Sequence, residues 1–338
     1  SIGVSAHGAF LYLHSPKMVH LRARHATIWD IHAEFSVSGS KSWHERYKEP
    51  RWGINGMFVT LGNEELLGYA FNASTYIRLP LIKPKESNYQ LGLRLGAGLS
   101  YLTKKFTITD NYGNSAIGSH INGLMQAGLE NTFRFGRFRL IAGLYFTHMS
   151  NAAYKVPNLG LNYPSLGLGI NYQLRPSMEI SDQEIPLPAT PGKWIAEVTG
   201  AIGIKEIYPV LGPKYGIFSI YGLSGRVWNQ RHSFLQGVDI LYHTGGRQEL
   251  RNMEDADESF ARAIRMGLSL GYGLHFGDFM LTFQMGSYVV NYKEIDGWIF
   301  HRIGGRRAFG PWVAFMALKT HFFQADFVEA GIGYRFLK

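Results

Sequence analysis

The sequence predicts an all-β protein, a transmembrane antiparallel β-barrel, from three observations. Of its 338 residues, 40 are glycine, 14% are aromatic and only 17% are charged, which is little charge for a soluble surface of this size. Apolar residues alternate with small or polar ones over many segments of about ten residues. No apolar run reaches the roughly 18 residues that a membrane-spanning helix requires, so a closed barrel is the remaining way to cross a bilayer.

The alternation is clearest in the segments 90–101 and 328–336. In the first segment, the apolar set is Leu91, Leu93, Leu95, Ala97, Leu99 and Tyr101. The residues between them are glycine, glutamine, arginine and serine. A soluble β-sandwich would also alternate, but we expect its solvated face to carry more lysine, glutamate and threonine and less glycine. The composition of the second face therefore favours the barrel.

The connections between these segments differ in length. Short turns are expected at 135–137 and 276–278, and longer polar connections at 41–52, 104–118, 151–163 and 246–257. Short turns at one end and long loops at the other are typical of bacterial outer-membrane barrels.

A proline-rich stretch, 176–192, divides the chain near its middle. Proline removes backbone donors from a sheet, so this stretch is a connection and not a central strand. Roughly seven alternating segments precede it and roughly seven follow it, which favours a single barrel of about 12 to 16 strands over 1–338. Residues 1–175 and 193–338 would be its two halves. Two fused barrels of about eight strands each are the alternative.

The charge and the cysteine count exclude several classes of function. The chain has no cysteine, hence no disulfide, no thiolate nucleophile and no cysteine-based metal site. The net charge of +9 is scattered along the chain, so we expect no nucleic-acid partner. We interpret small basic clusters (Arg22, Arg24 and His25; Arg302, Arg306 and Arg307) as loop or rim charges. They could meet anionic phosphates, or could be plain solvated turns.

Other features of the sequence predict no metal, no cofactor and an exported chain. Six histidines lie in the first 44 residues, but without close HxH or HxxxH spacing we expect loop or lumen histidines. The glycines follow strand alternation and form no phosphate-binding loop. The start of the sequence, 1–4, lacks the features of a signal peptide, which suggests that any export signal has been removed.

The segment 138–150 carries the candidate chemistry. Apolar residues occupy positions 140, 142, 144 and 146, and His148 and Ser150 continue the same face. On a lipid-facing surface both side chains lose hydration unless they bond to each other or to a lipid head group. Two residues along a strand are about 7 Å apart, near enough for imidazole and hydroxyl to approach. A histidine and a serine are the minimal base and nucleophile for acyl transfer, and a substrate reached from the membrane side would be a lipid ester.

The wider run is His-Met-Ser-Asn-Ala-Ala-Tyr-Lys-Val-Pro-Asn-Leu-Gly-Leu-Asn, 148–162. It resembles the lipid A 3-O-deacylases, outer-membrane barrels with a His-x-Ser-Asn motif followed by a Pro-Asn-x-Gly loop. The resemblance is specific over roughly 140–174. More loosely, most of the chain is similar to the long acyloxyacyl hydrolase-like barrels of the Bacteroidetes.

The resemblance implies roles for individual residues. Ser150 would be the nucleophile, His148 the general base, and Asn151 or Asn158 with nearby backbone amides the oxyanion stabilisers. The family completes a triad with a glutamate, where this chain has Asn162. Its amide oxygen could orient the imidazole but would not stabilise imidazolium as a carboxylate does. The enzyme could be slower, take an acid from elsewhere or be inactive.

Two functions are therefore open from the sequence. The first is a lipid A (lipopolysaccharide) ester hydrolase of the bacterial outer membrane, a carboxylic ester hydrolase without metal or cofactor. The second is a non-enzymatic barrel, either a porin or a structural subunit of a membrane complex, with protein partners undefined.

Overall fold

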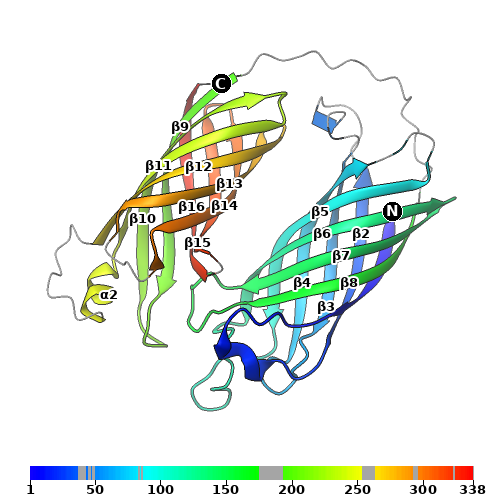
Figure 1. The fold of residues 1–338 in the computed structure, drawn as a ribbon, viewed down its shortest axis with the longest axis horizontal. Helices are drawn as coiled ribbons and strands as arrows, with labels where there is room; N and C mark the ends of the chain where they lie inside the picture. The colour runs from blue at the N-terminus through cyan, green and yellow to red at the C-terminus, as the bar shows by residue number, and fades with distance from the viewer. Residues whose placement is uncertain are drawn as a thin grey trace. The chain divides into compact units, whose positions relative to one another are not determined.

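A computed structural model describes the chain in the ranges 1–36, 43–44, 47, 50–82, 84, 87–174, 193–252, 263–291, 296–322 and 324–337. In these parts the chain forms two closed antiparallel barrels of eight strands each, with short helices in some of the connections (Figure 1). No helix in these ranges is long and apolar enough to cross a membrane. The all-β antiparallel barrel fold is confirmed, in its two-barrel form.

The first barrel closes through β1 and β8, which pair from Ile2 opposite Tyr172 to Ala9 opposite Ser165. The 3-10 helix η1 (Pro16–Leu21) lies in the connection between β1 and β2. The strands are β1 (Ile2–Ala9), β2 (Ala26–Ser36), β3 (Arg51–Thr60), β4 (Tyr69–Ile82), β5 (Tyr89–Leu102), β6 (Ile121–Phe135), β7 (Phe138–Ser150) and β8 (Leu161–Tyr172).

The second barrel closes through β9 and β16, with Gly203 opposite Glu329. The helix α2 (Gly246–Asn252) follows β11. The strands are β9 (Lys193–Glu206), β10 (Lys214–Trp228), β11 (His232–His243), β12 (Ile264–Phe276), β13 (Phe279–Val290), β14 (Ile299–Phe309), β15 (Trp312–His321) and β16 (Gln324–Leu337).

The single barrel over 1–338 that the strand count favoured is not what the chain forms. The backbone ladder of β8 is completed by β1, so the first barrel is closed before the proline-rich connection begins. That connection, 176–192, lies outside the described residues. In the structure β8 ends at Tyr172 and β9 begins at Lys193. The halves 1–175 and 193–338 stay a prediction.

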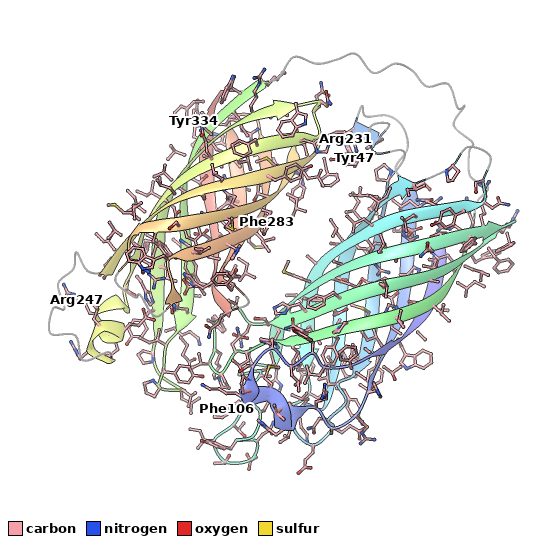
Figure 2. The ribbon with its side chains drawn as sticks, in the orientation of Figure 1. Tyr47, Phe106, Arg231, Arg247, Phe283 and Tyr334 are labelled. Carbon is pink, nitrogen blue, oxygen red and sulfur yellow. The ribbon has the colours of Figure 1, made fainter. Side chains whose placement is uncertain are left out.

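The outer faces carry the apolar residues that the alternation predicted. Leu99 and Tyr101 on β5 are exposed, while Ser100 between them is buried. In the second barrel, Phe283 on β13 and Tyr334 on β16 are exposed on the outer face (Figure 2). The predicted turns 135–137 and 276–278 join β6 to β7 and β12 to β13. The outer surface of each barrel thus suits a hydrocarbon environment.

The lumen of the first barrel is filled, as expected for eight strands. Glu34 forms ion pairs with Arg78 and with Arg139, each at 2.6 Å, and with Arg51 at 3.4 Å. Near the C-terminal end of β7 the lumen is apolar and is filled by residues such as Met149, which is fully buried. A packed lumen in the described part of this barrel argues against a conducting pore.

The second lumen holds two of the arginines interpreted above as rim charges, and that interpretation was wrong for them. Arg302 pairs with Asp239 at 3.2 Å and with Glu329 at 2.7 Å, and Arg306 pairs with Glu197. Both lie inside β14, where positions 302 and 306 face inward, so they serve as buried counter-ions. Adjacent glycines and an exposed Arg307 had made this strand look like a connection.

Candidate active site

The outer face of β7 places His148 and Ser150 at the end where the barrel has its longer loops. His148 lies between Met125 on β6 and Asn162 on β8 in the strand register. It shares the outward parity of the exposed Leu144 and is half-buried, whereas Ser150 is buried. The predicted continuation of the apolar face by these two residues is therefore what the strand shows.

Asn162 lies directly opposite His148 and binds it. The Nδ1 atom of His148 is 2.6 Å from Oδ1 of Asn162. This contact is the one expected of an acid residue in a catalytic triad, made here by a neutral amide. An amide oxygen can hold the imidazole in place, but it brings no negative charge to the site.

The other end of the Asn162 amide is also bound. Its Nδ2 atom donates to Nδ1 of His14 at 3.0 Å, and Nε2 of His14 is 3.0 Å from the carbonyl oxygen of Leu159. His14 is one of the six histidines that the sequence analysis expected to be loop or lumen histidines, and the structure places it in the connection before η1. A carbonyl, two imidazoles and an amide thus form one hydrogen-bonded chain.

Asn158 and Asn151 lie on the other side of Ser150. The Nδ2 atom of Asn158 donates to Oγ of Ser150 at 3.0 Å, while its Oδ1 accepts from the backbone N–H of Asn151 at 3.0 Å. The side chain of Asn151 donates to Oγ of Ser119 at 2.9 Å. Asn158 therefore directs a donor at the hydroxyl, and Asn151 contributes through its backbone and fixes the loop.

Gly160 lies against both His148 and Ser150. It has a positive φ of 77°, which disfavours residues with a Cβ. A Cβ there would stand 3.0 Å from Cε1 of His148 and 3.5 Å from Cβ of Ser150. Both side chains consequently pack against the bare backbone of this glycine.

Apolar rows continue from the site along the outer wall. Phe146 and Pro164 are paired one row from His148 and Asn162, and Leu144 and Leu166 are paired one row further. These residues line a groove of about 690 Å³. Successive rows on one face are about 7 Å apart, so the groove begins one row from the histidine, at Phe146 and Pro164, and extends along the strands.

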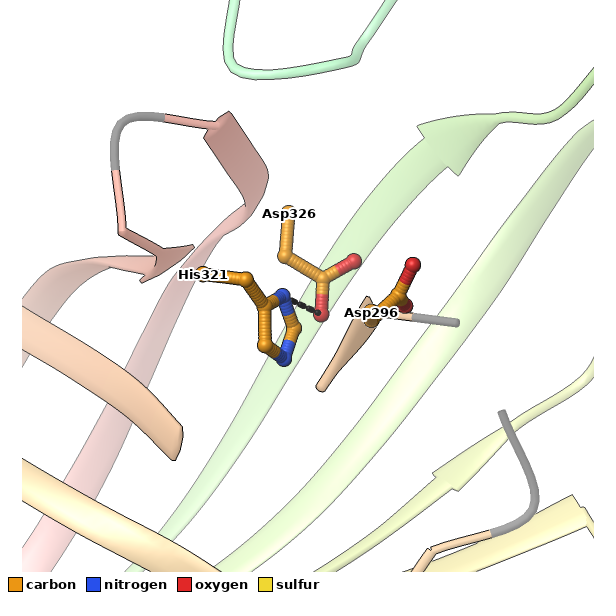
Figure 3. A group of neighbouring side chains, drawn as sticks. All are labelled: Asp296, His321 and Asp326. Atoms are coloured by element: carbon orange, nitrogen blue, oxygen red, sulfur yellow. Dashed lines mark ion pairs between the residues drawn. The ribbon is translucent and has the colours of Figure 1, made fainter. Parts of the chain in front are cut away.

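A second cluster, in the other barrel, combines the side chains of Asp296, His321 and Asp326 (Figure 3). Their potential ligand atoms lie within 4.8 Å of one another. However, Lys205 donates to Asp326 at 2.6 Å, and Arg265 pairs with Asp296 at 2.9 Å and with Asp326 at 3.5 Å. These cations neutralise the carboxylates, and we assign the cluster to the ion-pair network of the lumen.

Comparisons with known families follow the same division into two barrels. Residues 28–171 match the family described as lipid A 3-O-deacylase (PagL), and residues 194–338 match the family described as acyloxyacyl hydrolase, C-terminal domain. Barrel and matches together define an outer-membrane protein of the deacylase class. The first barrel is thus similar to the lipid A 3-O-deacylase family, and the second barrel to the acyloxyacyl hydrolase C-terminal domain. The resemblance inferred from the sequence is confirmed.

Other comparisons add little. No curated protein sequence matches the chain. The crystal structure of the outer membrane enzyme PagL matches with 14% identity, covering 49% of this chain and 97% of that one, at a TM-score of 0.34. A mutant porin of Rh. blastica matches with 9% identity over 99% of both chains, at a TM-score of 0.20. These scores are too low to support an inference.

Sequence reasoning did not assign a role to His14. A signal was present, because Phe10, Tyr12 and His14 alternate as an aromatic face ending in histidine, as do Phe146 and His148. The interpretation of the histidines as a group obscured this local pattern. Contact between positions 14 and 162 depends on barrel closure, which the sequence left open.

Proposed function

We propose that the first barrel is a lipid A ester hydrolase that removes an acyl chain from lipopolysaccharide. Ser150 acts as nucleophile, His148 as general base and Asn162 as the group that orients the base. The observation that carries this proposal is the 2.6 Å contact between Nδ1 of His148 and Oδ1 of Asn162, on the outer face beside Ser150. The family description points to the 3-O ester as the bond that is cut.

The reaction has two halves. Nε2 of His148 takes the proton of the Ser150 hydroxyl as Oγ attacks the ester carbonyl, and a tetrahedral oxyanion forms. The imidazolium then protonates the departing sugar oxygen, leaving the acyl group on Ser150. A water molecule, deprotonated by the same histidine, attacks the acyl-enzyme and releases the fatty acid.

The oxyanion needs donors close to the attacked carbonyl. Nδ2 of Asn158, at 3.0 Å from Oγ of Ser150, is the best-placed side-chain donor in the described part of the site. The backbone N–H of Asn151 donates to Oδ1 of Asn158, and this hydrogen bond holds the Asn158 amide with its Nδ2 toward Ser150. In this proposal Asn158 donates to the oxyanion, and Asn151 acts through the loop.

The surroundings suit an amphiphilic substrate. The groove lined by Phe146 and Leu144 begins one row from the histidine and is apolar, so an acyl chain can lie in it from the membrane side. Exposed Arg22 and Arg24 lie in the same β1–β2 connection as His14. They offer positive charge to the phosphates of lipid A at that end of the barrel.

The direct test is hydrolysis of lipopolysaccharide. The purified full-length protein, folded in detergent, is incubated with lipopolysaccharide, and lipid A is analysed by mass spectrometry. We expect loss of one acyl chain and release of the matching fatty acid. Ser150→Ala should release none above the uncatalysed background, because the attacking oxygen is removed. No acyl loss from the wild-type protein, or equal loss from the variant, would contradict the proposal.

A second expectation concerns Gly160. Gly160→Ala should lower kcat by about 100-fold, because a Cβ 3.0 Å from Cε1 of His148 displaces the imidazole from the serine. Gly136→Ala is the matched control, since Gly136 also has a positive φ, 57°, but has no neighbour within 4 Å of the added Cβ. Initial rates of fatty-acid release measure both variants. Equal losses in both would show that backbone strain, and not the contact with His148, causes the effect.

A further inference from the structure

We infer that His14 is a positioning residue of this site. It holds the Asn162 amide in the one orientation that keeps the proton on Nδ1 of His148 and leaves Nε2 free to act as the base. The inference deepens the proposed function and rests on it for its activity readout. It also makes a prediction about protonation that needs no activity.

The direction of the hydrogen-bonded chain follows from its fixed end. The carbonyl oxygen of Leu159 can only accept, so the Nε2 atom of His14 carries a hydrogen and donates to it. In neutral His14 the Nδ1 atom is then an acceptor, and it receives a hydrogen from Nδ2 of Asn162. Oδ1 of Asn162 therefore faces His148 and accepts from its Nδ1, so the lone pair of His148 is on Nε2.

The loop places His14 firmly. The pairing of β1 with β8 continues past the strand end, where the N–H of Tyr12 donates to the carbonyl of Asn162 at 2.8 Å. Two residues later His14 meets the turn at Leu159. The helix η1 follows at once, and its Met18 and Leu21 are fully buried in the apolar core. The imidazole is thus fixed from both sides.

An asparagine at this place needs such help, whereas a carboxylate does not. Both oxygens of a carboxylate accept, so either one selects the Nδ1–H form of the histidine. An amide has one accepting and one donating end. Turned around, Nδ2 of Asn162 would donate to Nδ1 of His148 and leave the proton on Nε2, where it blocks deprotonation of Ser150. His14 removes this ambiguity.

The inference is tested by a double-mutant cycle on the full chain, with lipopolysaccharide as substrate. His14→Phe keeps a ring of similar size and should lower kcat about tenfold, with KM little changed. This loss is smaller than that caused by a histidine held in the wrong tautomer, because the freed Asn162 amide still samples both orientations. In an Asn162→Asp background the same substitution should change kcat less than twofold. His20→Phe is the matched control, because His20 lies in η1 and, in the described contacts, its Nε2 contacts only the backbone carbonyl of Gly113. Equal losses in both backgrounds would overturn the inference.

A spectroscopic readout separates this inference from the proposed function. The protein is labelled with 15N-histidine, and the spectrum of His148→Gln identifies the signals of His148. We expect a protonated Nδ1 and a pyridine-type Nε2 in the wild-type protein, and a mixture of the two tautomers in His14→Phe. Unchanged tautomers in the variant would overturn the role of His14 even if the protein is active. The expected shift would support it even if lipopolysaccharide is not hydrolysed.

Discussion

Replacing His148 with glutamine is expected to lower kcat for acyl-chain release by about 10⁴-fold. Glutamine can still reach Asn162 with a side-chain amide, but it cannot take the proton of Ser150. Attack by an un-ionised hydroxyl then leaves only binding and the oxyanion donors to promote the reaction. KM should change little, since the acyl groove begins one row away at Phe146. Initial rates of fatty-acid release from lipopolysaccharide in detergent measure both constants.

The matched control is His20→Gln, which changes an exposed histidine of η1 in the β1–β2 connection. It should retain wild-type rates. The variant combining Ser150→Ala and His148→Gln should be no slower than either single variant, because a nucleophile and its base act as one unit. If the two losses multiply, or if His148→Gln keeps a tenth of the rate, His148 is not the base.

Alternation predicted the faces of the strands well, and this had a physical cause. A side chain on a strand has only two directions, so the outward placement of Leu99 and Tyr101 and of the site residues followed from position alone. His148 and Ser150 were recognised because polar groups broke an apolar face. The same alternation predicted that Asn162 lies on the outer side of β8, and in the structure it contacts His148 there.

The parts that the sequence could not predict depend on long-range pairing. Closure of β8 on β1, which decides between one barrel and two, is a choice of partner strand that leaves no periodic signal. The contact of His14 with Asn162 follows from that closure. The burial of Arg302 follows likewise from counter-ions on distant strands, Asp239 and Glu329.

Glu34 is expected to be among the most important residues for the stability of the first barrel, although it is far from the site in the register. It is the common counter-ion of Arg78, Arg139 and Arg51, and its carboxylate is fully buried. Glu34→Gln keeps the size of the side chain but removes the charge. The free energy of unfolding should fall by about 3–5 kcal/mol, because buried guanidinium groups lose their partner.

Urea unfolding of the folded protein, followed by tryptophan fluorescence and by heat-dependent mobility on gels, measures this loss. Glu64→Gln is the control, since Glu64 pairs with Arg24 at 3.7 Å on the exposed surface and should contribute at most about 1 kcal/mol. In the absence of urea, Glu34→Gln should hydrolyse lipopolysaccharide at the wild-type rate, because the ion-pair network and the outer-face site share no residue. Equal unfolding midpoints for the two variants would show that the remaining lumen carboxylates, such as Glu130 beside Arg78, compensate for the missing charge.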